Sequence, residues 1–299
     1  MQVITRPDFD GIVCAVLLLE ALGIKEPVKW VEPSTLQRGL VEIGKGAVIA
    51  NLPYNDGCTL WFDHHFTNRI HRPFRGAFKI APSAAGIIFE YYKGRFKRDY
   101  CKLVAETDKI DSADLTLDEV LHPERYNYVM LSMTVADGDD PDEIYWNKLV
   151  DLLGKFDIQE VLEDPDVIQR CHDVIIQNEK YATCLKENTR LEKHVAITDL
   201  RHLGKIPVGN RFLVYSLFPE SVVHLRIRYE NQNRNMIIVN VGHSIFNRNC
   251  NVNAGLLLSG FGGGGHRAAA STRFPVSKAD EYIPKIMDAL LKNENNEKR

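Results

Sequence analysis

The segment VITRPDFDGIVCAVLLLEAL, residues 3–22, decides how the first half of the chain is interpreted. Residues 3–5 are typical of a short buried strand, Asp8-Phe9-Asp10-Gly11 of a turn, and residues 12–22 of an apolar helix that Gly23 ends. Two further short apolar runs, 47–50 and 60–62, have the same strand character, and Ser83 begins another helix. Strands that alternate with helices predict an α/β fold with a parallel sheet covered on both faces.

The second half of the chain has a different pattern. Residues 167–191 resemble one long helix, and four β-like runs follow at 195–198, 212–216, 222–229 and 236–241. A helix-like run ends at Leu258, and a last amphipathic helix is expected at 278–291. We therefore predict an N-terminal domain over residues 1–170, a linking helix over 171–192, and a smaller α/β domain over 193–299, with a cleft between the two domains.

Composition excludes several classes of protein. The chain has 299 residues, of which 44% are hydrophobic and 26% charged, as in ordinary soluble globular proteins. Its six cysteines form no CxxC pair, which argues against a zinc ribbon or a disulfide framework and favours reduced thiols. The sequence has neither a signal peptide nor the ~18–20 apolar residues of a membrane span. We expect a cytoplasmic protein without a membrane partner.

Charge is distributed unevenly along the chain. The first 189 residues hold 21 Lys and Arg against 31 Asp and Glu, whereas the last 110 hold 16 against 9. An acidic half suits bound cations and a basic half suits anionic ligands, although two solvated surfaces of chance composition would give the same count.

Polar residues follow two of the expected strands. Asp8 and Asp10 come after the first strand, where two nearby carboxylates can bind a hard cation or activate water. That turn alone is weak support, because Asp and Gly are favoured in turns generally. Asp63-His64-His65 follows the strand at 60–62, and imidazole binds ions such as Mn²⁺ and Zn²⁺. Parallel strands would place both turns at the same edge of the sheet.

Two more segments could contribute. Asp108 and Asp111 belong to a third acidic cluster, for which a solvated helix end is the better interpretation when the cluster is taken alone. The glycines at 260 and 262–265 allow backbone N–H groups to approach an anion, and His266 and Arg267 would add positive charge. This segment matches neither a Walker loop nor a Rossmann fingerprint. A flexible linker is the alternative, but apolar residues flank the segment on both sides.

Together, these motifs resemble the DHH/DHHA1 phosphoesterase superfamily, and most closely its exopolyphosphatase-related and oligoribonuclease branches. The resemblance covers nearly the whole chain. Asp8-Phe9-Asp10-Gly11 is similar to the first motif, Asp63-His64-His65 to the motif that names the family, and Gly263-Gly264-Gly265-His266 to its GGGH motif. Asp108 is the best match to the last metal-binding Asp.

The resemblance implies a hydrolytic reaction with one or two Mn²⁺ or Mg²⁺ ions. Asp8 would bind the first ion, and Asp10, His64 and Asp108 would bind the second. His65 would contact the phosphoryl group beside Asp63. The far phosphate or terminal nucleotide would be held by residues of the second domain, namely Arg226, Arg228, Gly263, Gly264, Gly265, His266 and Arg267.

Two departures from the family pattern concern the first ion. No His precedes Asp8 in the stretch from Val3 to Pro7, and Asn51 stands where the family has a bridging Asp. A neutral amide offers one carbonyl oxygen and cannot bridge two cations as a carboxylate does. We expect the first ion site to be weakened or lost.

These observations give two hypotheses for function. The first is a metal-dependent phosphoesterase that hydrolyses a small phosphate-rich substrate, such as a short oligonucleotide, a nucleoside phosphate or polyphosphate. The second is a catalytically impaired nucleotide- or polyphosphate-binding protein of the same fold. No stripe of aromatic and basic residues predicts binding of long duplex nucleic acid. The resemblance also makes a homodimer plausible.

Overall fold

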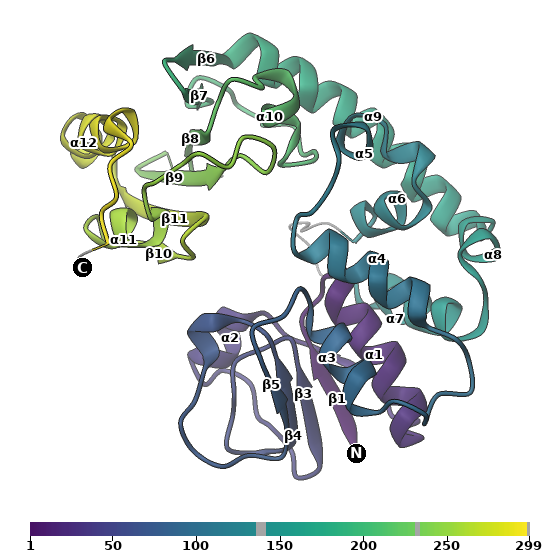
Figure 1. The fold of residues 1–299 in the computed structure, drawn as a ribbon. Helices are drawn as coiled ribbons and strands as arrows, with labels where there is room; N and C mark the ends of the chain where they lie inside the picture. Colours follow the sequence, from purple (N-terminus) through teal and green to yellow (C-terminus); the bar gives the residue numbers. More distant parts are fainter. Residues whose placement is uncertain (136–141, 231–233, 298–299) are drawn as a thin grey trace. The chain divides into compact units, whose positions relative to one another are not determined.

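A computed structural model describes residues 1–135, 142–230 and 234–297 (Figure 1). The chain divides into two compact units, each with its own sheet and core. Unit 1 comprises Met1–Leu115 and His122–His172, and unit 2 comprises Thr116–Leu121 and Asp173–Arg299. The two-domain α/β fold expected from the sequence is confirmed.

Unit 1 is built on a five-stranded sheet with the strand order β2-β1-β3-β4-β5, and all four pairings are parallel. Its strands are β1 (Gln2–Thr5), β2 (Lys29–Trp30), β3 (Ala47–Ala50), β4 (Cys58–Asp63) and β5 (Gly76–Phe78). Its helices are α1 (Phe9–Leu22), α2 (Pro33–Gln37), α3 (Ala84–Tyr91), α4 (Cys101–Asp111), α6 (Asn127–Met133), α7 (Glu143–Lys155) and α8 (Ile158–Leu162).

Successive strand residues of unit 1 enter two different cores. On β4, Leu60 and Phe62 pack in one cluster with helix α1, whereas Trp61 packs in a second cluster with Leu36 of α2. This alternation is the period-two geometry of a strand that is buried on both faces. Figure 1 shows α1, α3 and α4 on one side of the sheet and α2 on the other.

Two helices of unit 1 begin at capping side chains. The sequence predicted the cap at Ser83, but it placed residues 8–11 in a turn and began the first helix at residue 12, whereas α1 already begins at Phe9. Asp8 accepts a hydrogen bond from the N–H of Gly11 at the start of α1, and Ser83 accepts one from the N–H of Gly86 at the start of α3. Each bond satisfies an N–H that the helix itself leaves unpaired. Helix α1 ends at Gly23, whose φ of 62° is the left-handed conformation that glycine adopts without strain.

Unit 2 is built on a six-stranded sheet with the order β10-β11-β9-β8-β7-β6, in which only β7 and β8 pair in parallel. Its strands are β6 (Thr189–Glu192), β7 (Val195–Asp199), β8 (Val223–Tyr229), β9 (Met236–His243), β10 (Gly264–Gly265) and β11 (Ala269–Pro275). Its helices are α5 (Leu117–Leu121), α10 (Leu213–Leu217), α11 (Ala254–Ser259) and α12 (Ala279–Lys292), and α9 (Pro165–Asn188) runs from unit 1 into unit 2.

One face of this second sheet is apolar and the other is polar. Leu225 and Ile227 of β8 pack in a core with Leu258 of α11 and Ile286 of α12. Arg226, which lies between them on β8, points to the opposite face. Helices α11 and α12 therefore pack on the apolar face. The opposite face carries polar side chains, and there Arg226 contacts Tyr181 of α9 and His224 contacts Tyr215 of α10.

The structure corrects two further details of the sequence-based prediction. Residues 212–216, expected as a strand, lie largely in helix α10, in which the consecutive residues Leu213, Val214 and Tyr215 are all buried. A short apolar run does not distinguish a strand from a buried helical turn by periodicity alone. The long helix expected at 167–191 ends at Asn188, and Thr189–Glu192 form strand β6.

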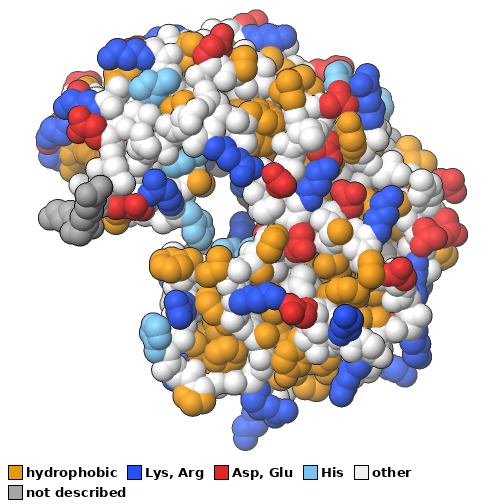
Figure 2. Space-filling view, in the orientation of Figure 1, with side chains coloured by type: hydrophobic (Ala, Val, Ile, Leu, Met, Phe, Trp, Pro, Cys, Tyr) orange, Lys and Arg blue, Asp and Glu red, His pale blue; other side chains and the backbone are white. Residues whose placement is uncertain are grey.

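Two surface properties bear on possible partners. In the described ranges, no helix combines the length and the apolar character that a bilayer crossing requires. The face drawn in Figure 2 carries Lys and Arg side chains beside Asp and Glu side chains, without a continuous field of either sign.

Candidate metal centre

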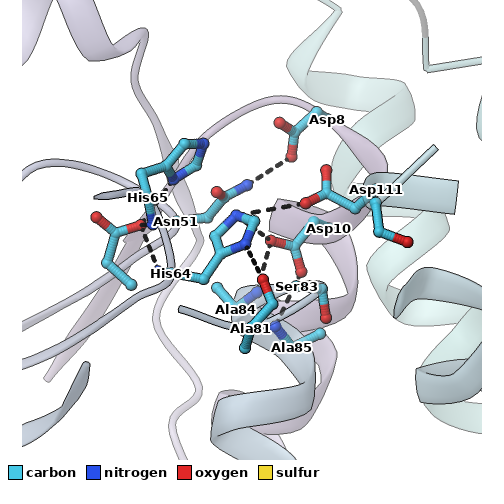
Figure 3. A network of polar contacts seen from close by, with 12 residues as sticks. Asp8, Asp10, Asn51, His64, His65, Ala81, Ser83, Ala84, Ala85 and Asp111 are labelled. Atoms are coloured by element: carbon cyan, nitrogen blue, oxygen red, sulfur yellow. Dashed lines mark hydrogen bonds and ion pairs between the residues drawn. The ribbon is translucent and has the colours of Figure 1, made fainter. Parts of the chain in front are cut away.

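The carboxyl ends of β1, β3 and β4 bring distant parts of the sequence together. Asp8 follows β1, Asn51 follows β3, and Asp63, the last residue of β4, is followed by His64 and His65. The three strands are neighbours in the sheet and parallel, so these residues share one edge. Figure 3 shows the side chains of Asp8, Asp10, Asn51 and His64 converging there.

Asp10 is the most deeply placed carboxylate of the site, with 2% of the residue exposed. Its Oδ2 accepts a hydrogen bond from the N–H of Ala84 (3.0 Å), and its Oδ1 accepts one from the N–H of Ala85 (2.9 Å). Both donors belong to the first turn of α3, where unpaired N–H groups and the helix dipole stabilise a negative charge. The preceding loop fits closely against this region, because a Cβ at Gly11 would lie 1.9 Å from the carbonyl oxygen of Arg6.

His64 presents one ring nitrogen to two carboxylates. Its Nδ1 lies 3.0 Å from the carbonyl oxygen of Ala81, which only accepts hydrogen bonds, so we assign the proton of the neutral ring to Nδ1. Its Nε2 lies 3.9 Å from Oδ2 of Asp10 and 3.3 Å from Oδ2 of Asp111. Nε2 is buried and has no hydrogen-bond partner among the described residues. A lone pair that faces two carboxylates in this way is the arrangement of a ligand set for a cation.

The donor set fits a divalent metal ion. Asp10, His64 and Asp111 each offer one ligand atom, and these three atoms lie within 4.8 Å of one another. Carboxylate oxygens suit Mg²⁺ and Mn²⁺, and a neutral imidazole suits transition ions, so the combined set fits Mn²⁺ well. The carbonyl of Ala81 fixes the orientation of the imidazole from behind, as partners of ligating histidines generally do.

The geometric cluster contains Asp111 rather than Asp108. Asp108 lies three residues earlier on α4, and its Oδ1 accepts a hydrogen bond from the hydroxyl of Ser83 at 2.5 Å. A Cβ at Gly86 would lie 2.7 Å from that same oxygen, so glycine is what lets the carboxylate approach α3. Burial, with a smaller contribution from Asp10, raises the pKa of Asp108. Asp108 thus lies next to the centre, and its role as a ligand stays a prediction.

Asp63 organises the turn that follows β4. It is fully buried, and its Oδ1 accepts hydrogen bonds from the N–H of His64 (2.9 Å) and from Nδ1 of His65 (2.8 Å). Its Oδ2 accepts a third bond from Nδ2 of Asn68 (2.7 Å). Burial disfavours the charged form of His65, but the hydrogen bond and the charge of Asp63 outweigh burial and raise the pKa of His65. Asp63 therefore orients His65 and favours its protonated form.

Groups of this chain donate hydrogen bonds to one carboxylate oxygen of Asp8 and form an ion pair with the other. Oδ1 accepts hydrogen bonds from the N–H of Gly11 (2.8 Å) and from Nδ2 of Asn51 (2.9 Å). Oδ2 lies 3.2 Å from Nε of Arg6. Burial raises the pKa of Asp8 to about 6, and the charge of Arg6 opposes that rise. Sequence reasoning did not identify Arg6 as part of the site, although it stands two residues before Asp8.

In unit 2, the glycine segment forms a tight hairpin between β10 and β11. A Cβ at Gly263 would lie 2.3 Å from the carbonyl oxygen of Ser271, and a Cβ at Gly265, whose φ is 145°, would lie 2.5 Å from that of Ala269. These two glycines are therefore required by the backbone itself. Gly264 differs, because a Cβ there would meet no atom of the described residues within 4 Å.

The candidate basic residues of unit 2 lie in different surroundings. Arg226 belongs to a row of paired residues, Thr198, Arg226, Asn240 and Ser271, that crosses four strands. Its Nη2 donates to Oδ1 of Asn240 (3.3 Å) and its Nη1 to the hydroxyl of Tyr181 (3.5 Å), so its charge has only neutral partners in these two bonds.

The other candidate residues of unit 2 also have partners within that unit. Arg228 donates from Nη1 to the carbonyl of Tyr229 (3.2 Å), and Arg267 pairs with Glu297 (2.5 Å). His266 is exposed, and its N–H bonds to the carbonyl of Ala269 (2.8 Å) across the hairpin. Arg226 is therefore the basic side chain of the polar sheet face that donates hydrogen bonds to two uncharged side chains, Asn240 and Tyr181.

The fold and the centre define a class of protein: a two-unit α/β protein with a candidate cation site at the carboxyl edge of a parallel sheet. Among solved structures, the chain is similar to a pGpG-specific phosphodiesterase, PggH, from Vibrio cholerae. The two share 29% sequence identity and a TM-score of 0.81, over 98% of this chain and 99% of that one.

Two more distant structures share the fold. RecJ in complex with Mn²⁺ from Thermus thermophilus is 12% identical, with a TM-score of 0.59 over 97% of this chain and 52% of RecJ. The DHH domain of a member of the s1p family of ribosomal proteins is 16% identical, with a TM-score of 0.53 over 98% of this chain and 87% of that one. Neither a protein-family model nor a curated protein sequence matches the chain.

These similarities agree with the resemblance to the DHH/DHHA1 phosphoesterase superfamily seen in the motifs, and they confirm that resemblance. The similarity to a phosphodiesterase supports the prediction that the chain is a phosphoesterase.

Proposed function

We propose that this chain is a metal-dependent phosphodiesterase that hydrolyses a short, linear, 5′-phosphorylated dinucleotide of the pGpG class. Such hydrolysis adds one water across the bridging P–O3′ bond and releases two nucleoside 5′-monophosphates. Similarity to the pGpG-specific enzyme over almost the full length of both chains supports the size and class of the substrate. The observation that carries the proposal is the buried Nε2 of His64, which faces Asp10 and Asp111 without a hydrogen bond among the described residues.

Asp10, His64 and Asp111 would hold a divalent ion, for which Mn²⁺ is the best match to this donor set. RecJ, which shares the fold, was solved in complex with Mn²⁺. When bound, such an ion supplies a Lewis acid that lowers the pKa of a coordinated water and polarises the phosphoryl group. The two carboxylates and the neutral imidazole balance the charge of one divalent ion.

The chain's own residues would then bind and orient the substrate. His65, held by Asp63 and favoured in its protonated form, is placed to donate a hydrogen bond to a phosphoryl oxygen. In unit 2, Arg226 and the exposed backbone at Gly264 are the candidate contacts for an anionic ligand. The neutral partners of Arg226 leave its positive charge available to an anion.

The test is direct hydrolysis of pGpG by the purified chain with Mn²⁺, with GMP quantified by chromatography. We expect turnover that chelation abolishes, and that His64→Ala lowers by at least about 1,000-fold, because several kcal/mol of metal-derived stabilisation are lost. His71→Ala is the matched control, since His71 is exposed in the loop that leads to the amino end of β5. Wild-type turnover by His64→Ala would refute the assignment of the centre.

A catalytically impaired binding protein is the second candidate. The engagement of Asp8 by Arg6 and Asn51 favours it, because that carboxylate is then less available to an ion. It predicts a rise in melting temperature with pGpG by mass action, but no GMP release with Mn²⁺, Mg²⁺ or Co²⁺. The same assay with polyphosphate tests the exopolyphosphatase-related interpretation. A cytoplasmic location and a homodimer stay predictions from the sequence.

A further inference from the structure

The family resemblance assigns the positions of Asp8 and Asn51 to the first ion. In this structure, however, the side chains of Asp8 and Asn51 bond to each other, and Asp8 also bonds to other groups of the chain. Three donors surround the Asp8 carboxylate: the N–H of Gly11, the amide of Asn51 and the guanidinium of Arg6. A carboxylate has about four lone-pair sites, so most of its accepting capacity is already used. A metal ion could bind Asp8 only by displacing these donors.

The amide of Asn51 is fixed in an orientation that opposes a shared ion. Asn51 is 1% exposed, its backbone has a φ of 54°, and its N–H bonds to the carbonyl of Phe62 (3.0 Å). Because Nδ2 donates to Asp8, Oδ1 points away from that carboxylate, and within the described chain Oδ1 has no partner. If the amide were reversed, Oδ1 of Asn51 would contact Oδ1 of Asp8, and two acceptors would face each other. The hydrogen bond to Asp8 therefore assigns the orientation of the amide.

The charges of the two halves of the site differ. Asp10 and Asp111 with neutral His64 carry −2, which matches one divalent ion. Asp8, Arg6 and Asn51 together carry zero, so a second divalent ion placed among them would be uncompensated. Removing one negative charge from a ligand set and adding a fixed positive one both act against cation binding.

We propose that this centre binds a single divalent cation, at Asp10, His64 and Asp111, and that Arg6 supplies the second positive charge. This inference rests on the proposed function, in which the centre faces a phosphoryl group. A guanidinium keeps its charge at all physiological pH values and forms paired hydrogen bonds with phosphoryl oxygens, which an ammonium does not. Arg6 is one-third exposed and its charge acts on both Asp8 and His65, so it lies beside the residues that would contact the substrate.

The first experiment counts bound ions without requiring turnover. Mn²⁺ binding is measured by equilibrium dialysis and metal analysis, and exchange coupling between neighbouring Mn²⁺ ions by electron paramagnetic resonance. We expect one Mn²⁺ per chain and an uncoupled spectrum for the wild type. The double variant Arg6→Ala/Asn51→Asp should bind two with a coupled spectrum, because it restores a carboxylate and removes the competing cation. Two wild-type ions with dissociation constants within tenfold of each other would overturn the proposal.

The second experiment asks whether the charge of Arg6 acts on the substrate. Arg6→Gln should lower kcat for pGpG by about 100-fold, the equivalent of a charged hydrogen bond, while one Mn²⁺ still binds at least as tightly as in the wild type. Arg6→Lys should recover part of that loss, and a folding defect would show in circular dichroism. Arg72→Gln is the matched control, since Arg72 pairs with Asp56 (2.8 Å) away from the centre. Full activity of Arg6→Gln would contradict the assignment.

The outcomes separate this inference from the proposed function. A wild-type chain that binds one Mn²⁺ and does not hydrolyse pGpG refutes the function but supports the single-ion count. A chain that hydrolyses pGpG with two bound ions supports the function and refutes the inference.

Discussion

The two units of this protein hold side chains of opposite charge, and these side chains differ in their burial and in their hydrogen-bond partners. In unit 1, the carboxylate of Asp10 is buried and held by backbone N–H groups at the start of α3. In unit 2, Arg226 is partly exposed on a sheet face and is held by the neutral side chains of Asn240 and Tyr181. The fixed, buried set can select one small cation, whereas the more open set suits a larger anion. The comparison predicts that changes in unit 1 act on catalysis and changes in unit 2 act on substrate binding.

The largest effect should come from Asp10→Asn. The substitution removes a negative charge from the cation site and turns an amide toward the N–H donors of Ala84 and Ala85. We expect kcat/KM for pGpG to fall by at least about 1,000-fold, with loss of Mn²⁺ binding. Both are measured on the same preparation. Asp151→Asn is the control, because Asp151 is 74% exposed on α7 and pairs with Lys155 one helical turn later. Retained Mn²⁺ affinity would place the ion elsewhere.

A smaller loss is expected from Asp63→Asn, because Asp63 acts through its neighbours. The change weakens the acceptor that orients His65 and the turn of His64, and groups of this kind typically contribute about 10- to 100-fold to activity. We predict that kcat falls in that range while one Mn²⁺ still binds. Asn68→Ala removes a single donor to Asp63 and should cost less than tenfold. An unchanged kcat for Asp63→Asn would mean that His65 is oriented by other contacts.

The residues at the carboxyl edge of the parallel sheet could be predicted, because short sequence patterns mark the strands and helices that position them. Short apolar runs predicted β1, β3 and β4, and Ser83 marked the start of α3 through its capping hydroxyl. Parallel pairing then required the residues after those strands to meet. What followed from tertiary contacts could not be predicted. Asp108 and Asp111 are three residues apart on α4, and only the approach of Asp108 to Gly86 and Ser83 decides which one faces His64.

Two other features depend on contacts that no motif encodes. Arg6 is an ordinary charged residue in the sequence and gains significance only because the turn places it beside Asp8. The glycine run was recognisable, but the sequence could not separate glycines required by backbone packing from the one that leaves open space. That distinction needs the register of β10 against β11.

The units should also differ in their response to acid. Burial, with a contribution from Arg226, lowers the pKa of His224 in unit 2 to about 3. Below the usual pKa of 6.5, the unfolded chain therefore binds a proton that the folded chain does not. Stability is complete above pH 6.5 and declines as the pH falls, by about 2 kcal/mol at pH 5 from this residue. His243 acts in the same direction, because burial lowers its pKa as well.

Urea unfolding at pH 7.5 and pH 5 tests this difference. All three tryptophans, Trp30, Trp61 and Trp146, lie in unit 1, so their fluorescence reports on unit 1 and far-ultraviolet circular dichroism reports on both units. We expect acid to shift the dichroism transition more than the fluorescence transition. His224→Gln should reduce that shift by about 2 kcal/mol, since the substitution removes the titrating group. Equal acid shifts for the wild type and His224→Gln would contradict the prediction.

The smallest expected effect separates the two kinds of glycine in the hairpin. Gly264→Ala adds a methyl group that would meet no atom of the described chain within 4 Å, so the melting temperature should stay the same. If the exposed backbone at Gly264 binds substrate, the methyl group crowds that surface, and KM for pGpG should rise by about threefold, or roughly 0.6 kcal/mol, at constant kcat.

Gly263→Ala is the contrasting variant, because its Cβ would lie 2.3 Å from a backbone oxygen of β11. It should lower the melting temperature by several degrees, since overpacking costs about 1–3 kcal/mol. An unchanged KM for a stably folded Gly264→Ala would exclude the hairpin backbone from substrate binding and leave Arg226 as the main anion contact of unit 2.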